Sequence, residues 1–229
     1  MKITILTLFP EMFTGPLNLS ILKHAQEKGV VQIVTKDIRE FGVGKHKQVD
    51  DTPYGGGIGM VMRVDVLHAA IKSVKEKLSK EEQKVILMSA KGSTFTQSTA
   101  KSFTALKHLI IICGHYEGVD ERVSAFIDEE ISIGDFVATG GEIPAMLIAD
   151  CVIRLLPGVL KTGVTDHESF SLGDGKETYL EYPQFTNPRS YADADVPEIL
   201  LSGDHKKITA WRLSQAREKT MKLRPDLLK

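Results

Sequence analysis

Three segments of the chain combine glycine with side chains that can form hydrogen bonds. They are Ser89–Gly92, Gly114–Gly118 and Gly134–Glu142. Because glycine has no side chain, it allows the backbone to lie close to a small molecule, and the hydroxyl, imidazole and carboxylate groups beside it can orient that molecule. Each segment alone fits a tight turn as well as a binding loop. A fold that brings all three together would favour ligand binding.

Asp50–Met60 is a fourth glycine-rich segment, with four glycines. It overlaps the stretch Asp37–Gly59, which has no sustained hydrophobic periodicity and is therefore predicted to be a long loop. Its bare backbone amides suit a phosphate or the face of a flat base. A purely structural loop fits the same composition equally well.

The sequence lacks the familiar nucleotide and metal motifs. No G-x-G-x-x-G follows an apolar run and no G-x-x-x-x-G-K-[ST] occurs, which counts against nicotinamide-dependent dehydrogenases and P-loop NTPases. The seven histidines lack metal-ligand spacing, so we expect no zinc site. Cys113 and Cys151 lie in apolar stretches without a neighbouring base, which is typical of buried, reduced thiols in a cytosolic protein.

Alternating strands and helices must position the three segments. Short apolar or mixed runs predict strands over Ile3–Leu8, Val30–Thr35, Val85–Met88, Leu109–Cys113 and Glu130–Ile133. Periodicity predicts helices over Asn18–Lys28, Gln97–Leu106, Val119–Phe126 and Glu142–Leu156, and one capped by Asp65 with an apolar face from Val66 to Leu78. This alternation is typical of an α/β fold with a parallel sheet. In such sheets ligands bind beyond the carboxyl ends of the strands, where the three segments lie.

The length of the chain, 229 residues, suits one main domain with a small appendage. We expect a main domain over residues 1–160, a flexible linker over 161–176 and a mainly helical domain over 177–229. Asp204–Met221 is predicted to be the clearest helix of the small domain, with Trp211 as its anchor.

Basic residues concentrate at the C-terminal end. Residues 203–229 hold eight Lys or Arg against three Asp or Glu, although the whole chain has a net charge of −1. This pattern fits a phosphate-rich partner and a solvated basic helix equally well. The apolar run in Met1–Phe9 is too short for a signal peptide or a membrane span, so we expect a cytoplasmic protein with no membrane partner.

Nine short stretches, spread over nearly the whole chain, form a specific pattern. They are Phe9–Phe13, Pro53–Gly57, Gly59–Met62, Cys113–Arg122, Ser132–Asp135, Thr139–Glu142, Leu156–Leu160, Trp211–Arg212 and Arg224–Leu228. In order and spacing the pattern resembles the bacterial tRNA (guanine-N(1))-methyltransferases of the TrmD family, in the knotted SPOUT class. The resemblance implies a parallel-sheet fold with a deep trefoil knot, a small helical C-terminal domain, and a homodimer whose active sites are shared between subunits.

The resemblance also implies a binding site for S-adenosylmethionine among the three segments. By position, its residues are Leu87, Ser89, Gly114, Tyr116, Glu117, Ile133, Gly134, Asp135, Phe136, Val137, Ala138, Gly140 and Gly141. For Glu117 two roles stand open: contact with the cofactor or a magnesium ion, and bracing of its own loop. Bare amides suit the edge of adenine, and apolar walls suit its faces.

The implied reaction is methylation of N(1) of the guanosine at tRNA position 37, next to the anticodon, after the base is flipped out. A general base must remove the N(1) proton. By position this base is Glu168, where the family commonly has aspartate, with Asp166 as the alternative. Arg154 matches the residue that stabilises negative charge on O6, and an ordinary i,i+4 pair with Asp150 is its other interpretation. We expect the linker 161–176 to order when tRNA binds and to bring Glu168 into place.

The chain departs from the family pattern in three places. His115 and Asn187 stand where arginine is usual, and Leu172–Tyr182 is longer than the common pattern. Fewer positive charges predict weaker binding of the tRNA anticodon stem-loop by the basic C-terminal domain. Two alternatives remain: a knotted methyltransferase with another RNA target, which the Pro53–Met62 segment disfavours, and a non-catalytic RNA-binding protein.

Overall fold

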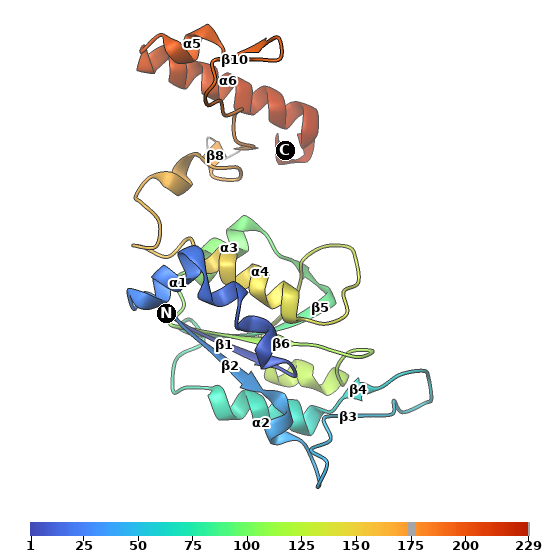
Figure 1. The fold of residues 1–229 in the computed structure, drawn as a ribbon. Helices are drawn as coiled ribbons and strands as arrows, with labels where there is room; N and C mark the ends of the chain where they lie inside the picture. Colours follow the sequence, from blue (N-terminus) through green and yellow to red (C-terminus); the bar gives the residue numbers. More distant parts are fainter. Residues whose placement is uncertain (174–176, 229) are drawn as a thin grey trace. The chain divides into compact units, whose positions relative to one another are not determined.

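The computed structural model describes residues 1–173 and 177–228. They form two compact units, Met1–Leu160 and Lys161–Lys229 (Figure 1). Residues 174–176, at the end of the predicted linker, and Lys229 lie outside the described residues. No helix in the described part of the chain is long and apolar enough to span a membrane.

A parallel sheet forms the centre of the first unit, and among the described residues it has five strands in the order β2-β1-β6-β5-β7. The strands are β1 (Lys2–Thr7), β2 (Gln32–Asp37), β5 (Gln83–Thr94), β6 (His108–Cys113) and β7 (Glu129–Ser132). The prediction of an α/β fold with a parallel sheet is confirmed. Strands buried on both faces read as continuous apolar runs, which explains why the sequence indicated them clearly.

Helices cover both faces of the sheet (Figure 1). One face carries α1 (Ser20–Glu27), α3 (Gln97–Phe103) and α4 (Glu142–Ile153), together with the 3₁₀ helices η1 (Pro10–Phe13) and η2 (Pro16–Asn18). The other face carries α2 (Val64–Val74) and the 3₁₀ helices η3 (Ile38–Phe41) and η4 (Glu121–Phe126).

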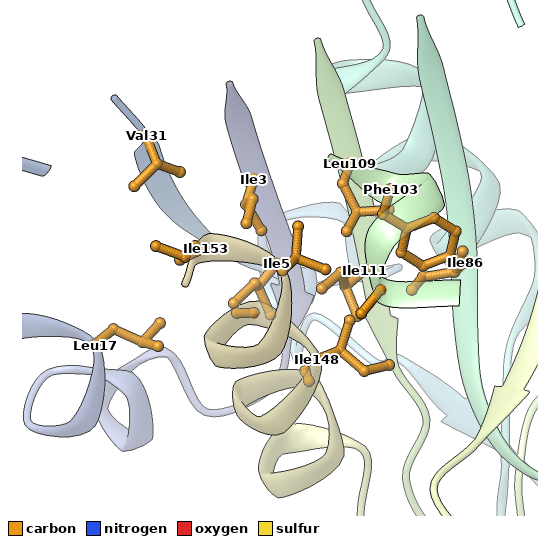
Figure 2. Packing of buried hydrophobic residues seen from close by; sticks show 14 of the residues in the cluster. Ile3, Ile5, Leu17, Val31, Ile86, Phe103, Leu109, Ile111, Ile148 and Ile153 are labelled. Atoms are coloured by element: carbon orange, nitrogen blue, oxygen red, sulfur yellow. The ribbon is translucent and has the colours of Figure 1, made fainter. Parts of the chain in front are cut away.

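The strand pleat divides the apolar side chains between two cores. On β1, Ile3 and Ile5 join the core beneath α4, whereas Leu6 joins the core beneath α2. Figure 2 shows the first of these cores, in which Ile148 of α4 and Phe103 of α3 pack against the strands. Burial on both sides fixes the register of the strands, and therefore fixes where their carboxyl ends lie.

Several predicted boundaries are wrong. β5 continues through residues 89–92, which were expected to be a loop; its pairing with β7 shifts register between Met88 and Ser93, so these polar residues form an irregular part of the strand. The N-cap position of α2 is Arg63, whose side chain makes no capping hydrogen bond, and not Asp65; the helix ends at Val74 and does not reach Leu78.

Two further predicted helices are shorter than expected. The helix expected over Glu142–Leu156 ends at Ile153, with Arg154 as its cap. The one expected over Val119–Phe126 is the 3₁₀ helix η4 and begins only at Glu121.

The second unit contains short elements and one long helix. They are η5 (Val164–His167), β8 (Leu172–Gly173), β9 (Thr178–Tyr179), β10 (Ser190–Tyr191), β11 (Ala194–Asp195), α5 (Glu198–Leu201), α6 (His205–Leu223) and η6 (Pro225–Leu228). The side chain of Asp204 caps α6 by accepting from the N–H of Lys207 at 3.1 Å. The buried residues of α6 are Ala216 and Thr220. Trp211 is half-buried, with its ring centroid 6.4 Å from that of Phe185, and its role as an anchor stays a prediction.

Candidate functional site

A cavity lies at the carboxyl ends of β5, β6 and β7, where the three glycine-containing segments come together. Its volume is about 330 Å³, which falls in the lower part of the range for small-molecule sites. Residues 87–91, 114–119, 131–133 and 136–141 line it, together with Pro144 of α4. The fold therefore brings the three segments together, as the predicted parallel sheet implies.

Eleven of the thirteen predicted cofactor-binding residues line this cavity. They are Leu87, Ser89, Gly114, Tyr116, Glu117, Ile133, Phe136, Val137, Ala138, Gly140 and Gly141. Gly134 and Asp135 do not line it: Asp135 is exposed, and Gly134 turns the chain after β7 with a φ of +148°. Lys91, His115 and Thr139 also line it. They are not among the predicted binding residues, although each lies inside a predicted segment.

A glycine brings the third segment directly against the second. A β-carbon on Gly141 would lie 2.7 Å from Cα of Cys113 and 2.9 Å from the backbone nitrogen of Gly114. The N–H of Gly141 donates to the carbonyl of Gly114 at 2.8 Å. Because no side chain fits between them, the wall of the cavity at this point is backbone.

The second segment also holds the glycine-rich loop, Asp50–Met60. The N–H of Glu117 donates to the carbonyl of Met60 at 3.0 Å, and the N–H of Met62 donates to the carbonyl of Gly118 at 3.0 Å. A β-carbon on Gly59 would lie 2.4 Å from Cγ of Glu117. The backbone of Glu117 therefore helps to hold the base of this loop, and the two roles predicted for its carboxylate stay predictions.

The tip of the glycine-rich loop is open to solvent, where Tyr54 is 100% and Ile58 95% exposed. Its base is ordered by the antiparallel pair β3 (Asp50–Asp51) and β4 (Val61–Met62). The stretch 37–59 is therefore not the single long loop that its composition predicted, because it contains η3 and β3.

A buried carboxylate, that of Glu142, lies next to the residues that line the cavity. Glu142, in the first turn of α4, is 3% exposed, and its Oε1 accepts a hydrogen bond from the hydroxyl of Thr7 at 2.8 Å. The N-terminus of a helix favours a negative charge. Burial raises the pKa of the Cys113 thiol well above its ordinary value, and the nearby carboxylate of Glu142 raises it further. Cys113 therefore stays a thiol, as expected of a buried cysteine.

Within the described residues, no three His, Cys, Asp or Glu side chains are grouped as a metal site would require. Glu117 is exposed at the edge of the cavity. Magnesium usually keeps several waters and takes one or two protein carboxylates, so a single glutamate does not by itself define such a site.

The family model described as tRNA (Guanine-1)-methyltransferase TrmD matches residues 1–229. The chain belongs to the TrmD family. It is 52% identical over 231 residues to a tRNA (guanine-N(1)-)-methyltransferase of Dictyoglomus turgidum, and the match covers 100% of this chain and 90% of that protein. A protein of the same name from Carboxydothermus hydrogenoformans is 53% identical over 231 residues, with 100% and 88% covered. The predicted family is thereby confirmed.

The two predicted catalytic residues of this TrmD family member belong to different units. Arg154 is half-buried at the end of α4, where its N–H donates to the carbonyl of Asp150 at 3.1 Å. Glu168 is half-buried in the second unit, where its carbonyl accepts from the N–H groups of Ser171 at 3.0 Å and Leu172 at 3.3 Å. Their catalytic roles stay predictions.

The departures from the family pattern lie in different surroundings. His115 lines the cavity, whereas Asn187 is exposed in the second unit. Among the described residues of the segment 172–182, β8 and β9 pair antiparallel. Of these departures, His115 is the one that lines the cavity of the first unit.

Proposed function

We propose that this protein transfers a methyl group from S-adenosylmethionine to N(1) of a guanosine in tRNA, at position 37. The observation that carries the proposal is a family match over the full length of the chain, in a structure whose three glycine-containing segments form one cavity. The knot implied by the family resemblance is part of the proposal, since it would place those segments at the same end of the sheet.

The residues of the cavity fit the methyl donor. When bound, S-adenosylmethionine supplies an electrophilic methyl group on a sulfonium. Backbone exposed at Gly114 and Gly140 offers hydrogen bonds to an adenine edge, and Leu87 and Ile133 offer apolar contact to its faces. A closely crowded glycine, Gly141, leaves the backbone bare where a side chain would fill the space.

Residues of the chain have to make N(1) of guanine nucleophilic. In the proposal, Glu168 accepts the N(1) proton of guanine, because a neutral amide-like nitrogen attacks poorly. The guanidinium of Arg154 stabilises the negative charge that then spreads to O6. Asp166, which is exposed, is the alternative base. Most of the remaining rate comes from holding the nucleophile in line with the methyl group.

The second unit is proposed to hold the anticodon stem-loop through the basic side chains of α6, since phosphate contacts position an RNA. We further propose a cytoplasmic homodimer with active sites shared between subunits, which light scattering and mixed dimers of inactive variants would test. The predicted alternative role of Glu117, contact with a magnesium ion, is tested by EDTA. Turnover that survives metal removal unchanged would contradict it.

A methyl-transfer assay tests the proposal as a whole. Purified tRNA with guanosine at position 37 is compared with the same tRNA carrying adenosine there, and mass spectrometry locates the product. We expect methylation only of the first, at N(1). Methylation elsewhere would favour a knotted methyltransferase with another target, and absence of S-adenosylmethionine binding in calorimetry would leave an RNA-binding protein.

A further inference from the structure

The imidazole of His115 is held between two aromatic rings at the edge of the cavity. Its centroid lies 5.1 Å from that of Phe9 and 4.9 Å from that of Tyr116, both in edge-to-face arrangements. The residue lines the cavity, yet Nδ1 is buried and has no hydrogen-bond partner in the described part of the chain. An atom facing the open cavity would be exposed, so Nδ1 faces the protein.

Nδ1 of His115 lies beside the backbone of Gly140 and the carboxylate of Glu142. A β-carbon on Gly140 would lie 2.7 Å from Nδ1 and 2.4 Å from Oε2 of Glu142, so the two polar atoms converge on one point. The other carboxylate oxygen, Oε1, already accepts from Thr7. Oε2 is thus the oxygen on the side of His115.

The two atoms are chemically complementary. A carboxylate accepts hydrogen bonds and does not donate, whereas a neutral imidazole has one N–H and one lone pair. Buried polar atoms are nearly always hydrogen-bonded, and an unpaired one requires an explanation. The two atoms do not form a hydrogen bond in this structure. A proton on Nδ1 and a rotation of the Glu142 carboxylate toward the imidazole, whose plane the rings of Phe9 and Tyr116 fix, would pair the buried nitrogen.

We propose that His115 carries its proton on Nδ1 and donates a hydrogen bond to Oε2 of Glu142, and that this bond holds the Gly140–Gly141 turn in the shape that binds the methyl donor. His115 and Glu142 are positioning residues, since they act through the backbone of Gly140. The choice of ligand rests on the proposed function. The inference assigns the departure at position 115 to donor binding rather than to tRNA affinity.

Nitrogen NMR of the full-length protein tests the tautomer without any ligand. At about pH 8, where an unperturbed imidazole is neutral, we expect the proton of His115 on Nδ1. We also expect Glu142→Gln to change the Nδ1 signal, whereas Asp150→Asn, on the exposed side of the same helix, leaves it unchanged. A proton predominantly on Nε2 in the unaltered protein would overturn the inference, whether or not the donor binds.

Two substitutions of His115 then test whether the position of the N–H group matters. His115→Asn keeps an N–H near the place of Nδ1, and His115→Gln moves it toward the place of Nε2. We expect His115→Asn to bind S-adenosylhomocysteine within about threefold of the unaltered protein and His115→Gln to lose about tenfold or more in affinity, as for a hydrogen bond to a charged group. Affinity for tRNA without the donor should be equal in both.

Thermal melts establish that both variants fold, and calorimetry measures the affinities. Equal donor affinity in the two variants, or a loss confined to tRNA binding, would overturn the inference. If the unaltered protein binds neither S-adenosylmethionine nor S-adenosylhomocysteine, the proposed function fails, and the NMR result alone decides the tautomer.

Discussion

At the scale of single residues, the proton on guanine N(1) makes Glu168 the sharpest test of the proposed reaction. Glu168→Gln keeps the size of the side chain and removes its basicity, so we expect kcat to fall by about 10²–10⁴-fold. The Kd for S-adenosylmethionine, measured by calorimetry, should stay within about twofold, since the cavity is built by other residues.

Asp166→Asn is the matched control for Glu168, because both carboxylates lie in the same short segment. We expect its turnover to stay near that of the unaltered protein. A large loss in Asp166→Asn with none in Glu168→Gln would transfer the role of base to Asp166.

Gly141 can form part of the cavity wall because it has no side chain. Alanine there would collide with the backbone of Cys113 and Gly114, so we expect Gly141→Ala to weaken S-adenosylmethionine binding by about tenfold or more, about 1.4 kcal/mol. Gly15→Ala is the control, since nothing lies within 4 Å of the added carbon and its φ of −84° suits alanine. Equal affinities in the two variants would contradict a backbone wall at Gly141.

At the scale of elements, the hydroxyl of Thr220 joins α6 to the strand region of the second unit. It accepts from the N–H of Leu180 at 2.8 Å and donates to the carbonyl of Ala216 at 2.7 Å. Thr220→Val leaves a part-buried N–H unpaired, so we expect a loss of about 1–3 kcal/mol in the free energy of unfolding. Faster hydrogen exchange at Leu180 would locate the effect.

Thr209→Val is the control for Thr220, because Thr209 is exposed and its hydroxyl donates to the carbonyl of His205 one turn earlier in the same helix. Its expected effect on stability is within about 0.5 kcal/mol. Losses of equal size in both variants would show that the hydroxyl of Thr220 has no special structural role.

Three strands meet at a buried histidine at the amino end of the sheet. In β6, Nε2 of His108 lies 2.8 Å from Oγ1 of Thr4, and its Nδ1 lies 3.0 Å from Oε1 of Gln83. Burial lowers the pKa of His108, although Glu76 nearby opposes this effect. The neutral ring is therefore the one that the folded state favours.

The stability of the sheet should follow this titration. The contribution of neutral His108 is fully present above about pH 6.5, the ordinary histidine pKa, and is lost as the pH falls through the lower pKa of the folded state. Urea unfolding between about pH 7.5 and pH 5 measures the loss. His108→Gln should flatten this dependence, and an unchanged slope would assign it to other groups.

At the scale of the whole molecule, binding of tRNA should depend on salt through exposed lysines of the second unit. Lys206 and Lys222 lie exposed on α6. Replacing both with glutamine should weaken tRNA binding and reduce the slope of log K against log salt by about one for each phosphate that a lysine no longer neutralises. The Kd for S-adenosylmethionine should not change. An unaltered salt slope would remove α6 from the RNA-binding surface.

The sequence predicts the sheet better than the site, and the reason is physical. The strand β6 reads as an apolar run because both of its faces are buried, so no long-range information is needed to find it. The register shift in β5 and the surroundings of His115 depend on residues distant in the chain, such as Gly140. The predicted parallel sheet already places the three segments together, but their ligand became predictable only through the family resemblance, since each segment alone also fits a simple turn.

The backbone wall at Gly141, with the crowded Gly140 beside it, has a consequence for inhibitors. Resistance to a competitive inhibitor commonly arises when a larger side chain excludes it and the substrate still enters. At Gly141 the space for a first carbon is already taken by Cys113 and Gly114, and at Gly140 by Glu142 and His115. A compound that packs against these two glycines meets a surface that the chain can enlarge only by damaging its own site, so we expect escape substitutions to arise elsewhere in the lining.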